Sequence, residues 1–278
     1  MARVIIELSA HCNMRCPICS YKIMRRPKGF IELSLFKKII NDVKTNGHKI
    51  DCLHHFGEPL LYPHLIEAIQ YMTDNGIHTE IPISTNGLLL TPQLADQLYK
   101  AGLRSILVAI DTLIPEAYRQ LRGGNVEVIK KNMHDVVNNT GLVVHAQLMP
   151  SKYNIGENEA SFYNEFGRRN FQVLPWFVIR MDGADNASTN LSHKPSEVNK
   201  TKCDKLYERV VIMWNGITAL CCLDMNGELE TGNLNLNTIN ESFSGTKANS
   251  LRHKIRSNDL PDLCRRCYAD HIILHNIQ

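Results

Sequence analysis

The sequence predicts an α/β fold in which a largely parallel sheet is followed by a smaller, cysteine-rich region. Two observations predict it. Short apolar, β-rich runs alternate with helical patterns up to about residue 180, and such alternation is typical of parallel strands joined by right-handed crossovers. The composition then changes at about Asp182, after which cysteines recur between Cys203 and Cys267.

The predicted strands are the six apolar runs rich in β-branched residues. They cover residues Arg3–Leu8, Ile50–Phe56, Glu80–Ser84, Arg104–Ile110, Leu142–Met149 and Phe171–Ile179.

The predicted helices carry apolar residues at helical spacing and have recognisable ends. Thr91, for example, is an N-cap residue followed by Pro92 at the first helical position, where proline is favoured. We expect helices to begin at Ser34, Pro63, Thr91, Val126 and about Glu157, and to end near Gly47, Gly76, Gly102, Asn139 and Arg169.

Length and composition limit the classes of protein. A chain of 278 residues can bury one large core, or one large and one small core. We expect domains at residues 1–190 and 191–278, with the polar stretch Asp182–Thr201 as a linker or a loop that covers substrate. A net charge of +3 does not suggest nucleic acid or a membrane surface as partner.

The nine cysteines suggest metal binding rather than disulfides. Their number is odd, several are clustered, and no signal peptide or apolar run of roughly 18–20 residues is present. Reduced, metal-binding cysteines are typical of intracellular proteins. We therefore expect a cytoplasmic protein without a membrane segment.

Cys12, Cys16 and Cys19 follow the first predicted strand with the spacing C-x3-C-x2-C. Three close thiolates can hold three corners of a four-iron cluster, which leaves the fourth iron open to a small ligand. A structural zinc ion would need a fourth protein ligand, and His11 is available. From this segment alone both readings stay open.

The triplet resembles the signature of the radical S-adenosylmethionine (SAM) enzymes, and three further segments resemble motifs of that family. Each follows one of the next three predicted strands, where parallel α/β folds place their sites. The segments are Phe56-Gly57-Glu58-Pro59, Ser84-Thr85-Asn86-Gly87 and Val108-Ala109-Ile110-Asp111. The resemblance implies a partial (β/α)6 radical SAM barrel.

The resemblance also implies how SAM is bound and used. The open iron would chelate the amino and carboxylate groups of SAM, and electron transfer would cleave SAM to methionine and a 5′-deoxyadenosyl radical. The resemblance implies that the segment of Gly57, Glu58 and Pro59 binds the SAM ammonium and that Ser84 and Asn86 lie in a turn beside the SAM site. It also implies that Asp111 contacts the ribose and that Arg122 binds the SAM carboxylate. Alternatively, Asp111 caps a turn and Arg122 is solvated at a helix end.

Two residues depart from the family pattern. Phe56 occupies the position where the family usually has the first glycine of a pair, and Ile18 occupies a position that is usually aromatic and packs on adenine. An aliphatic side chain can still cover a purine face.

The C-terminal cysteines resemble those of the SPASM/twitch extension found on many radical SAM enzymes. Twelve residues separate Cys203 from Gly216, four separate Gly216 from Cys221, and Cys264-Arg265-Arg266-Cys267 follows later. The resemblance implies a small α+β domain that holds one auxiliary four-iron cluster through Cys203, Cys221, Cys264 and Cys267. A zinc ribbon on the same four thiolates is the alternative.

Two residues are candidates for contact with the substrate. Arg180 resembles an arginine that lies near the substrate hydroxyl in the twitch-bearing 2-deoxy-scyllo-inosamine dehydrogenases of butirosin biosynthesis; otherwise it is a surface arginine. Cys222 could donate a hydrogen atom to a substrate radical, or could be structural beside Cys221. Cys52 is expected in the core, and one of His54 and His55 in the barrel interior.

These residues leave several reactions open. The first is oxidation of a carbinol in a small polar substrate, such as a sugar or aminocyclitol, with an electron passed to the auxiliary cluster. The others are epimerisation with Cys222 as hydrogen donor, and modification of a ribosomal peptide. All three imply SAM, two 4Fe-4S clusters and a flavodoxin or ferredoxin-type electron donor. A zinc-bound structural or nucleic-acid-binding protein is the non-enzymatic alternative.

Overall fold

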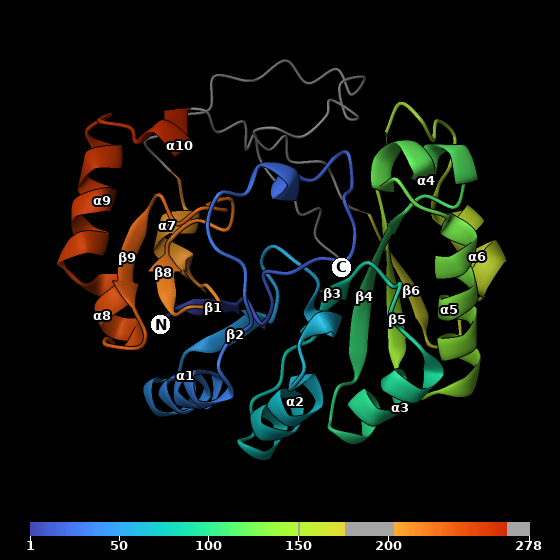
Figure 1. The fold of residues 1–278 in the computed structure, drawn as a ribbon, viewed down its shortest axis with the longest axis horizontal. Coiled ribbons are helices and arrows are strands. Elements are labelled where there is room, and N and C mark those ends of the chain that lie inside the picture. The colour runs from blue at the N-terminus through green and yellow to red at the C-terminus, as the bar shows by residue number, and fades with distance from the viewer. Residues whose placement is uncertain (150, 176–202, 266–278) are drawn as a thin grey trace.

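The computed structural model describes residues 1–149, 151–175 and 203–265. Their strands form two sheets (Figure 1). One sheet is parallel and contains, in order, β3 (Ser84–Thr85), β4 (Ser105–Asp111), β5 (Val143–Leu148) and β6 (Phe171–Pro175). The other has the order β2 (Lys49–Cys52), β1 (Arg3–Ile6), β7 (Arg209–Ile212), β8 (Ile217–Ala219) and β9 (Glu230–Asn233).

The two sheets together form the wall of a partial barrel. The backbone N–H of Leu53, directly after β2, donates to the carbonyl of Pro82 at 2.6 Å, close to where β3 begins. Strands β1 to β6 are therefore arranged in chain order, as the predicted partial (β/α)6 barrel requires.

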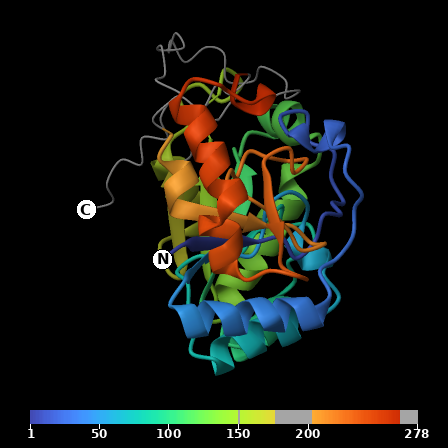
Figure 2. The same ribbon diagram turned by 90° about the vertical axis from the view of Figure 1, so that its left-hand side faces the viewer.

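Helices cover the outside of this wall (Figures 1 and 2). They are α1 (Leu33–Asn46), α2 (Leu65–Asp74), α3 (Pro92–Lys100), α4 (Pro115–Arg122), α5 (Val126–Asn139) and α6 (Glu159–Phe166). Phe36 and Ile39 of α1 are fully buried in one core cluster with Val4 and Ile6 of β1. Because side chains alternate along a strand, Arg3, Ile5 and Glu7 face the interior of the barrel.

The C-terminal region extends the sheet at the free edge of β1. Strand β7 pairs in parallel with β1, while β8 and β9 continue the sheet in antiparallel fashion. Short helices precede and follow these strands: α7 (Lys205–Glu208), α8 (Ile239–Ser244), α9 (Thr246–Arg256) and α10 (Asp262–Arg265). The predicted α+β composition of this region is confirmed, and the predicted boundary between residues 190 and 191 lies outside the described residues.

Several predicted element ends differ from the structure: β2 ends at Cys52 rather than at Phe56, and β3 covers Ser84–Thr85 rather than Glu80–Ser84. Ser34 is not a cap, because the N-cap of α1 is Glu32 and Ser34 lies inside the first turn. Helix α4 was not predicted, since it presents only Ala117, Tyr118 and Leu121 to the core in an otherwise polar segment. The end of the last predicted strand, after Pro175, lies outside the described residues.

The caps can be tested by a pair of substitutions. The hydroxyl of Thr91 accepts a hydrogen bond from the N–H of Leu94 at 3.2 Å, whereas Ser34 caps nothing. Thr91→Ala should therefore lower the free energy of unfolding by about 1 kcal/mol, and Ser34→Ala should change it by less than about 0.5 kcal/mol. Urea unfolding of both variants measures the difference, and equal losses would contradict the assignment.

Candidate active site

The loop after β1 carries the three N-terminal cysteines. Cys16 is buried, and Cys12 and Cys19 are partly buried. Two backbone amides point at their sulfurs: Met14 N–H lies 3.5 Å from Cys12 Sγ, and Tyr21 N–H lies 3.4 Å from Cys19 Sγ. Hydrogen bonds of this kind stabilise a metal-bound thiolate and tune the potential of a cluster.

The thiols of this loop interact electrostatically with one another. Burial raises the pKa of Cys12 to about 11, and the neighbouring Cys16 and Cys19 contribute to the rise. Among the described residues, no three His, Cys, Asp or Glu side chains converge on one point as ligands of a single metal ion would. A four-iron cluster holds its cysteine sulfurs at separate corners, so three neighbouring thiols, two of them with N–H donors, fit such a cluster.

Glu58 joins this loop to two others. Its backbone N–H donates to the carbonyl of His11 at 2.7 Å. Its buried carboxylate accepts hydrogen bonds from the N–H of Leu60 (3.0 Å), the hydroxyl of Thr85 (2.7 Å) and the N–H of Asn86 (2.8 Å). Burial raises the pKa of Glu58, while these donors and Arg122 act in the opposite direction. The carboxylate is thus fixed at the carboxyl ends of β2 and β3.

Gly57 and Pro59 flank Glu58, and Gly57 must be glycine. Its φ is +111°, and a Cβ there would lie 2.3 Å from the carbonyl oxygen of Ser9. A side chain would therefore push the Glu58 segment away from the cysteine loop. Pro59 opens the short 3-10 helix η2 (Pro59–Leu61), which begins directly after Glu58.

The turn after β3 also contacts the cysteine loop. The amide of Asn86 donates to Asn13 Oδ1 at 2.7 Å. Ser84 N–H donates to His54 Nδ1 at 3.2 Å. Burial lowers the pKa of His54 to about 4, so that its ring is neutral and can accept this bond.

Asp111 ends β4 in a left-handed conformation (φ 65°) and is fully buried. Its carboxylate accepts hydrogen bonds from Arg122 Nε at 2.5 Å and from the Gln147 amide at 2.6 Å. Burial opposes the charge of Arg122, yet the Asp111 carboxylate raises the pKa of this guanidinium above its usual value. Burial raises the pKa of Cys16, and Arg122 lowers it. Arg122 therefore lies between Asp111 and the cysteine loop, not at a solvated helix end.

The structure describes three of the four C-terminal cysteines predicted as ligands. Cys203 precedes α7 and β7, Cys221 follows β8, and Cys264 lies in α10. Because β7 and β8 are antiparallel, Cys221, which follows β8, lies toward the end of the hairpin at which β7 begins. Leu223 N–H lies 3.4 Å from Cys221 Sγ. Cys267 and Arg180 lie outside the described residues.

Cys222 and the histidines lie near one another. His55 Nε2 is 2.9 Å from the carbonyl oxygen of Cys222, and Cys222 Sγ is 4.0 Å from Arg209 Nη1. Because the carbonyl can only accept, Nε2 of His55 donates. Cys52, predicted in the core, is partly buried at the end of β2 and donates to the His54 carbonyl at 3.4 Å.

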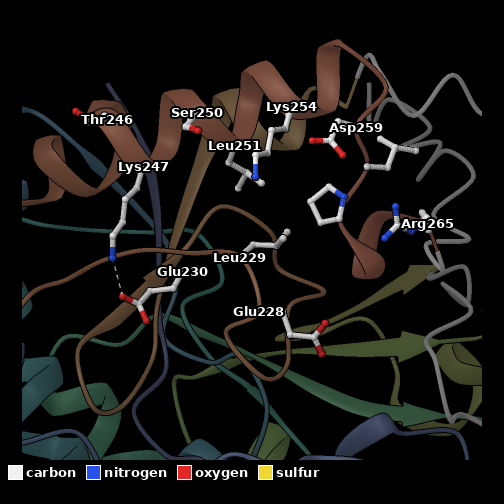
Figure 3. A pocket seen from close by; sticks show the side chains of 12 residues that line it. Glu228, Leu229, Glu230, Thr246, Lys247, Ser250, Leu251, Lys254, Asp259 and Arg265 are labelled. Atoms are coloured by element: carbon white, nitrogen blue, oxygen red, sulfur yellow. Dashed lines mark hydrogen bonds and ion pairs between the residues drawn. The ribbon is translucent and has the colours of Figure 1, made fainter.

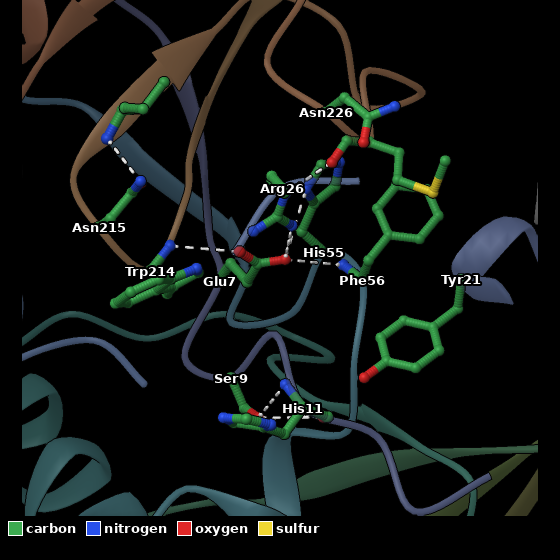
Figure 4. A network of polar contacts seen from close by, with 12 residues as sticks. Glu7, Ser9, His11, Tyr21, Arg26, His55, Phe56, Trp214, Asn215 and Asn226 are labelled. Carbon is green, nitrogen blue, oxygen red and sulfur yellow. Dashed lines mark hydrogen bonds and ion pairs between the residues drawn. The ribbon is translucent and has the colours of Figure 1, made fainter. Parts of the chain in front are cut away.

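One buried network was missed by the sequence analysis (Figure 4). The carboxylate of Glu7, which is 0% exposed, pairs with the guanidinium of Arg26 at 2.5 Å. It also accepts hydrogen bonds from the N–H groups of Phe56 (3.3 Å) and Trp214 (3.2 Å). The available signal was a glutamate inside the apolar run Arg3–Leu8, but the sequence does not indicate its partners.

A cavity of about 570 Å³ lies apart from these residues, between α9 and the loop before β9 (Figure 3). Charged side chains of both signs line it, including Glu228, Glu230, Lys247, Lys254 and Arg265. None of the predicted site residues lines it.

Comparison with known proteins identifies the family. Residues 6–154 match the radical SAM superfamily, and residues 203–268 match an iron–sulfur cluster-binding domain, SPASM. The chain therefore belongs to the radical SAM superfamily and carries a SPASM domain. These two domains imply SAM and two 4Fe-4S clusters as cofactors.

Among curated proteins, the chain is similar to a probable GTP 3′,8-cyclase of Methanococcus aeolicus and to an AdoMet-dependent heme synthase of Methanosarcina barkeri. It is 33% identical to the first over 162 residues, which are 54% of this chain and 48% of the relative. It is 33% identical to the second over 135 residues, which are 45% and 38% of the two chains. The chain thus spans about half the length, or less, of these relatives.

Among solved structures, the chain resembles BtrN in complex with AdoMet and 2-DOIA, with a TM-score of 0.64, 19% identity, and coverage of 96% of this chain and 92% of BtrN. It also resembles Streptococcus suis SuiB bound to the precursor peptide SuiA, with a TM-score of 0.61, 15% identity, and coverage of 90% and 66%. These likenesses support the fold. Within the part of the chain that the structure describes, no helix is long and apolar enough to span a bilayer.

The pair of Asp111 and Arg122 gives a testable prediction. Asp111→Asn keeps the shape but leaves a nearly buried guanidinium without its counter-charge, so the free energy of unfolding should fall by about 3 kcal/mol. Arg122→Gln should have a similar effect, and the double variant should lose less than the sum, because the two residues interact.

The control is the exposed ion pair of Glu116 and Arg119, which lies on α4, the helix that carries Arg122. Glu116→Gln should cost less than about 1 kcal/mol, since exposed pairs contribute little. Urea unfolding of the four variants decides the matter. Asp111→Asn losing no more than Glu116→Gln would contradict the assigned pairing.

Proposed function

We propose that this radical SAM enzyme oxidises a carbinol of a small polar substrate, such as a sugar or an aminocyclitol, and passes an electron to an auxiliary 4Fe-4S cluster. The SAM-binding cluster would supply the electron that cleaves SAM to the 5′-deoxyadenosyl radical, and this radical would take a hydrogen atom from the carbinol carbon. The substrate radical would then release its hydroxyl proton and pass its electron to the auxiliary cluster, which leaves a ketone. A flavodoxin or ferredoxin-type protein would supply the reducing electron.

The observation that carries the proposal is the contact between the turn after Cys221 and the barrel mouth. The carbonyl of Cys222 bonds to His55, at the end of β2. Asn226 Oδ1 accepts from the N–H of Arg25 at 2.9 Å, and the carbonyl of Met225 accepts from Arg26 Nε at 2.6 Å. An auxiliary cluster held by Cys221 would therefore lie beside the loop at which SAM is cleaved, as an electron acceptor for a substrate radical must.

The polar side chains on the interior face of the barrel favour the proposal of a polar substrate. Ser105 of β4 and His145 and Gln147 of β5 lie on the face opposite the side chains that pack in the helix-covered core. On the other side of the barrel, Arg209 of β7 lies 3.9 Å from Asp51 of β2. Arg209 Nε is buried and has no hydrogen-bond partner. Such donors and acceptors suit hydroxyl and amino groups of a ligand.

The loops described above supply the proposed contacts to SAM. Glu58 and the backbone of its segment would bind the ammonium, with Ser84 and Asn86 in the adjacent turn. Arg122 would pair with the SAM carboxylate, because a guanidinium can bind a carboxylate through two hydrogen bonds. Asp111 would then orient Arg122, in addition to or in place of a contact with the ribose. Arg180 is proposed as a substrate contact on the sequence resemblance alone.

Epimerisation is the second candidate, and one contact favours it. Cys222 Sγ lies beside Arg209, a residue of the interior face of β7. A thiol there could return hydrogen to a substrate radical. The relatives include other kinds of radical SAM protein, since one is named a probable GTP 3′,8-cyclase and SuiB was solved with a precursor peptide.

Cys222 and Cys221 separate the two candidates. For oxidation, Cys222→Ala should retain most of the product, while Cys221→Ala should still cleave SAM but lose most of the product with its electron acceptor. For epimerisation, Cys222→Ala should cleave SAM without inverting the substrate.

The assay would supply aminocyclitols and sugars deuterated at each carbinol carbon. Transfer of deuterium to 5′-deoxyadenosine identifies the carbon attacked, and mass spectrometry distinguishes a ketone from an epimer. Loss of product in Cys222→Ala with SAM cleavage intact would overturn the dehydrogenase proposal.

A further inference from the structure

The phenylalanine that departs from the family pattern has a partner in the SPASM region. Phe56 is buried in a small apolar cluster that is separate from the main core. Its other buried members are Ala10, Tyr21, Met24 and Met225, and the partly buried side chains packed against it are Cys12, Cys19 and Trp214. Met225 follows Cys221 by four residues. A side chain from the turn of the C-terminal region thus packs in the same cluster as two cysteines of the N-terminal loop.

A polar contact fixes the backbone of the same two residues. Arg26 donates to the carbonyl of Met225 at 2.6 Å and pairs with Glu7, whose carboxylate also accepts the N–H of Phe56 at 3.3 Å. Figure 4 shows Arg26 and Phe56 beside the carboxylate of Glu7. The side chain of Arg26 is only 7% exposed, and its guanidinium cannot turn away without leaving the buried Glu7 carboxylate without its counter-charge. Phe56 and Met225 are therefore held by both their side chains and their backbones.

The position of Phe56 determines the position of its neighbours. Gly57 packs directly against the carbonyl oxygen of Ser9, and Glu58 donates to the carbonyl of His11. A shift of Phe56 would move both residues relative to the cysteine loop. If Phe56 were the glycine usual in the family, the cluster that contains Met225 would lose this aromatic side chain.

We propose that Met225 is a positioning residue for the SAM-binding loops, which it supports through Phe56. The C-terminal region would then do more than hold an auxiliary cluster, since its turn would form part of the wall that sets the place of Glu58 and of the cysteine loop. The inference rests on the proposed SAM site but is independent of the reaction that follows SAM cleavage.

The test is Met225→Ala in the full-length protein with its clusters reconstituted. Removal of the side chain leaves a gap in the apolar cluster that holds Phe56, so SAM should bind about five- to fiftyfold more weakly, in the range of indirect couplings between sites. The dissociation constant is measured by titrating SAM and following the SAM-dependent change in the EPR spectrum of the reduced protein. Amide exchange should become faster at residues 9–26 and 53–61, and should be unchanged in α5.

Two further methionine variants complete the design. Met133→Ala deletes an equally large buried side chain from α5, which packs in the main core and not in the cluster of Phe56 and Met225, and should leave SAM affinity within about twofold of wild type. Met225→Leu restores the apolar volume and should recover the wild-type affinity. If Met225→Ala does not fold, Met225→Val is the smaller truncation and should show an intermediate loss.

Each outcome decides the inference. Weaker SAM binding in Met225→Ala with normal binding in Met133→Ala and Met225→Leu supports it. Wild-type affinity in Met225→Ala, or equal losses in Met225→Ala and Met133→Ala, overturns it and leaves the SAM site standing. A wild-type protein whose EPR spectrum does not respond to SAM would overturn the SAM site and the inference together.

Discussion

The arrangement of the site depends on the hydrogen bonds that the buried carboxylate of Glu58 accepts. Through it, the segment after β2 is tied to the turn after β3, and through its backbone N–H the same residue is tied to the cysteine loop after β1. A buried carboxylate is costly unless it is fully hydrogen-bonded. The three loops therefore satisfy Glu58 only when they adopt their positions together, so the fold itself arranges the proposed SAM site.

The second carboxylate with such a role is Glu7, one strand away. Glu7 pairs with Arg26 and accepts hydrogen bonds from Phe56 and Trp214. It thereby joins the loop after β1 and the segment after β2 to the end of β7. Because β7 lies directly against β1, the two ends of the described chain share one sheet. The loops that would hold the two clusters are therefore parts of one packed structure rather than of two loosely linked domains.

The sequence predicted those parts of the structure that depend on local patterns. The order of the six strands, the cap at Thr91 and the loops that carry Cys12, Glu58 and Asn86 follow from periodicity, turn residues and a family signature, whereas the bounds of the third strand were wrong. Helix α4 was missed because its burial comes from three side chains only, and Ser34 was misread because Glu32 takes the N-cap position in an extended conformation.

The parts that could not be predicted are contacts between segments far apart in the chain. Arg122 lies eleven residues after Asp111, but the third member of that group, Gln147, comes from the next strand. The contact of Arg26 with the Met225 carbonyl and the apolar cluster shared by Phe56 and Met225 depend on which strand lies beside β1. No local pattern indicates this, so the departure at Phe56 was visible in the sequence whereas its partner was not.

The most direct test of the account is anaerobic iron and sulfide analysis of reconstituted protein, with wild type beside a variant in which Cys12, Cys16 and Cys19 are all alanine. The account predicts about eight irons per chain in wild type and about four in the variant, because each cysteine set holds one four-iron cluster. About four irons in wild type and none in the variant would contradict it. The C-terminal cysteines would then hold zinc or no metal, and the oxidation proposed here would have no electron acceptor.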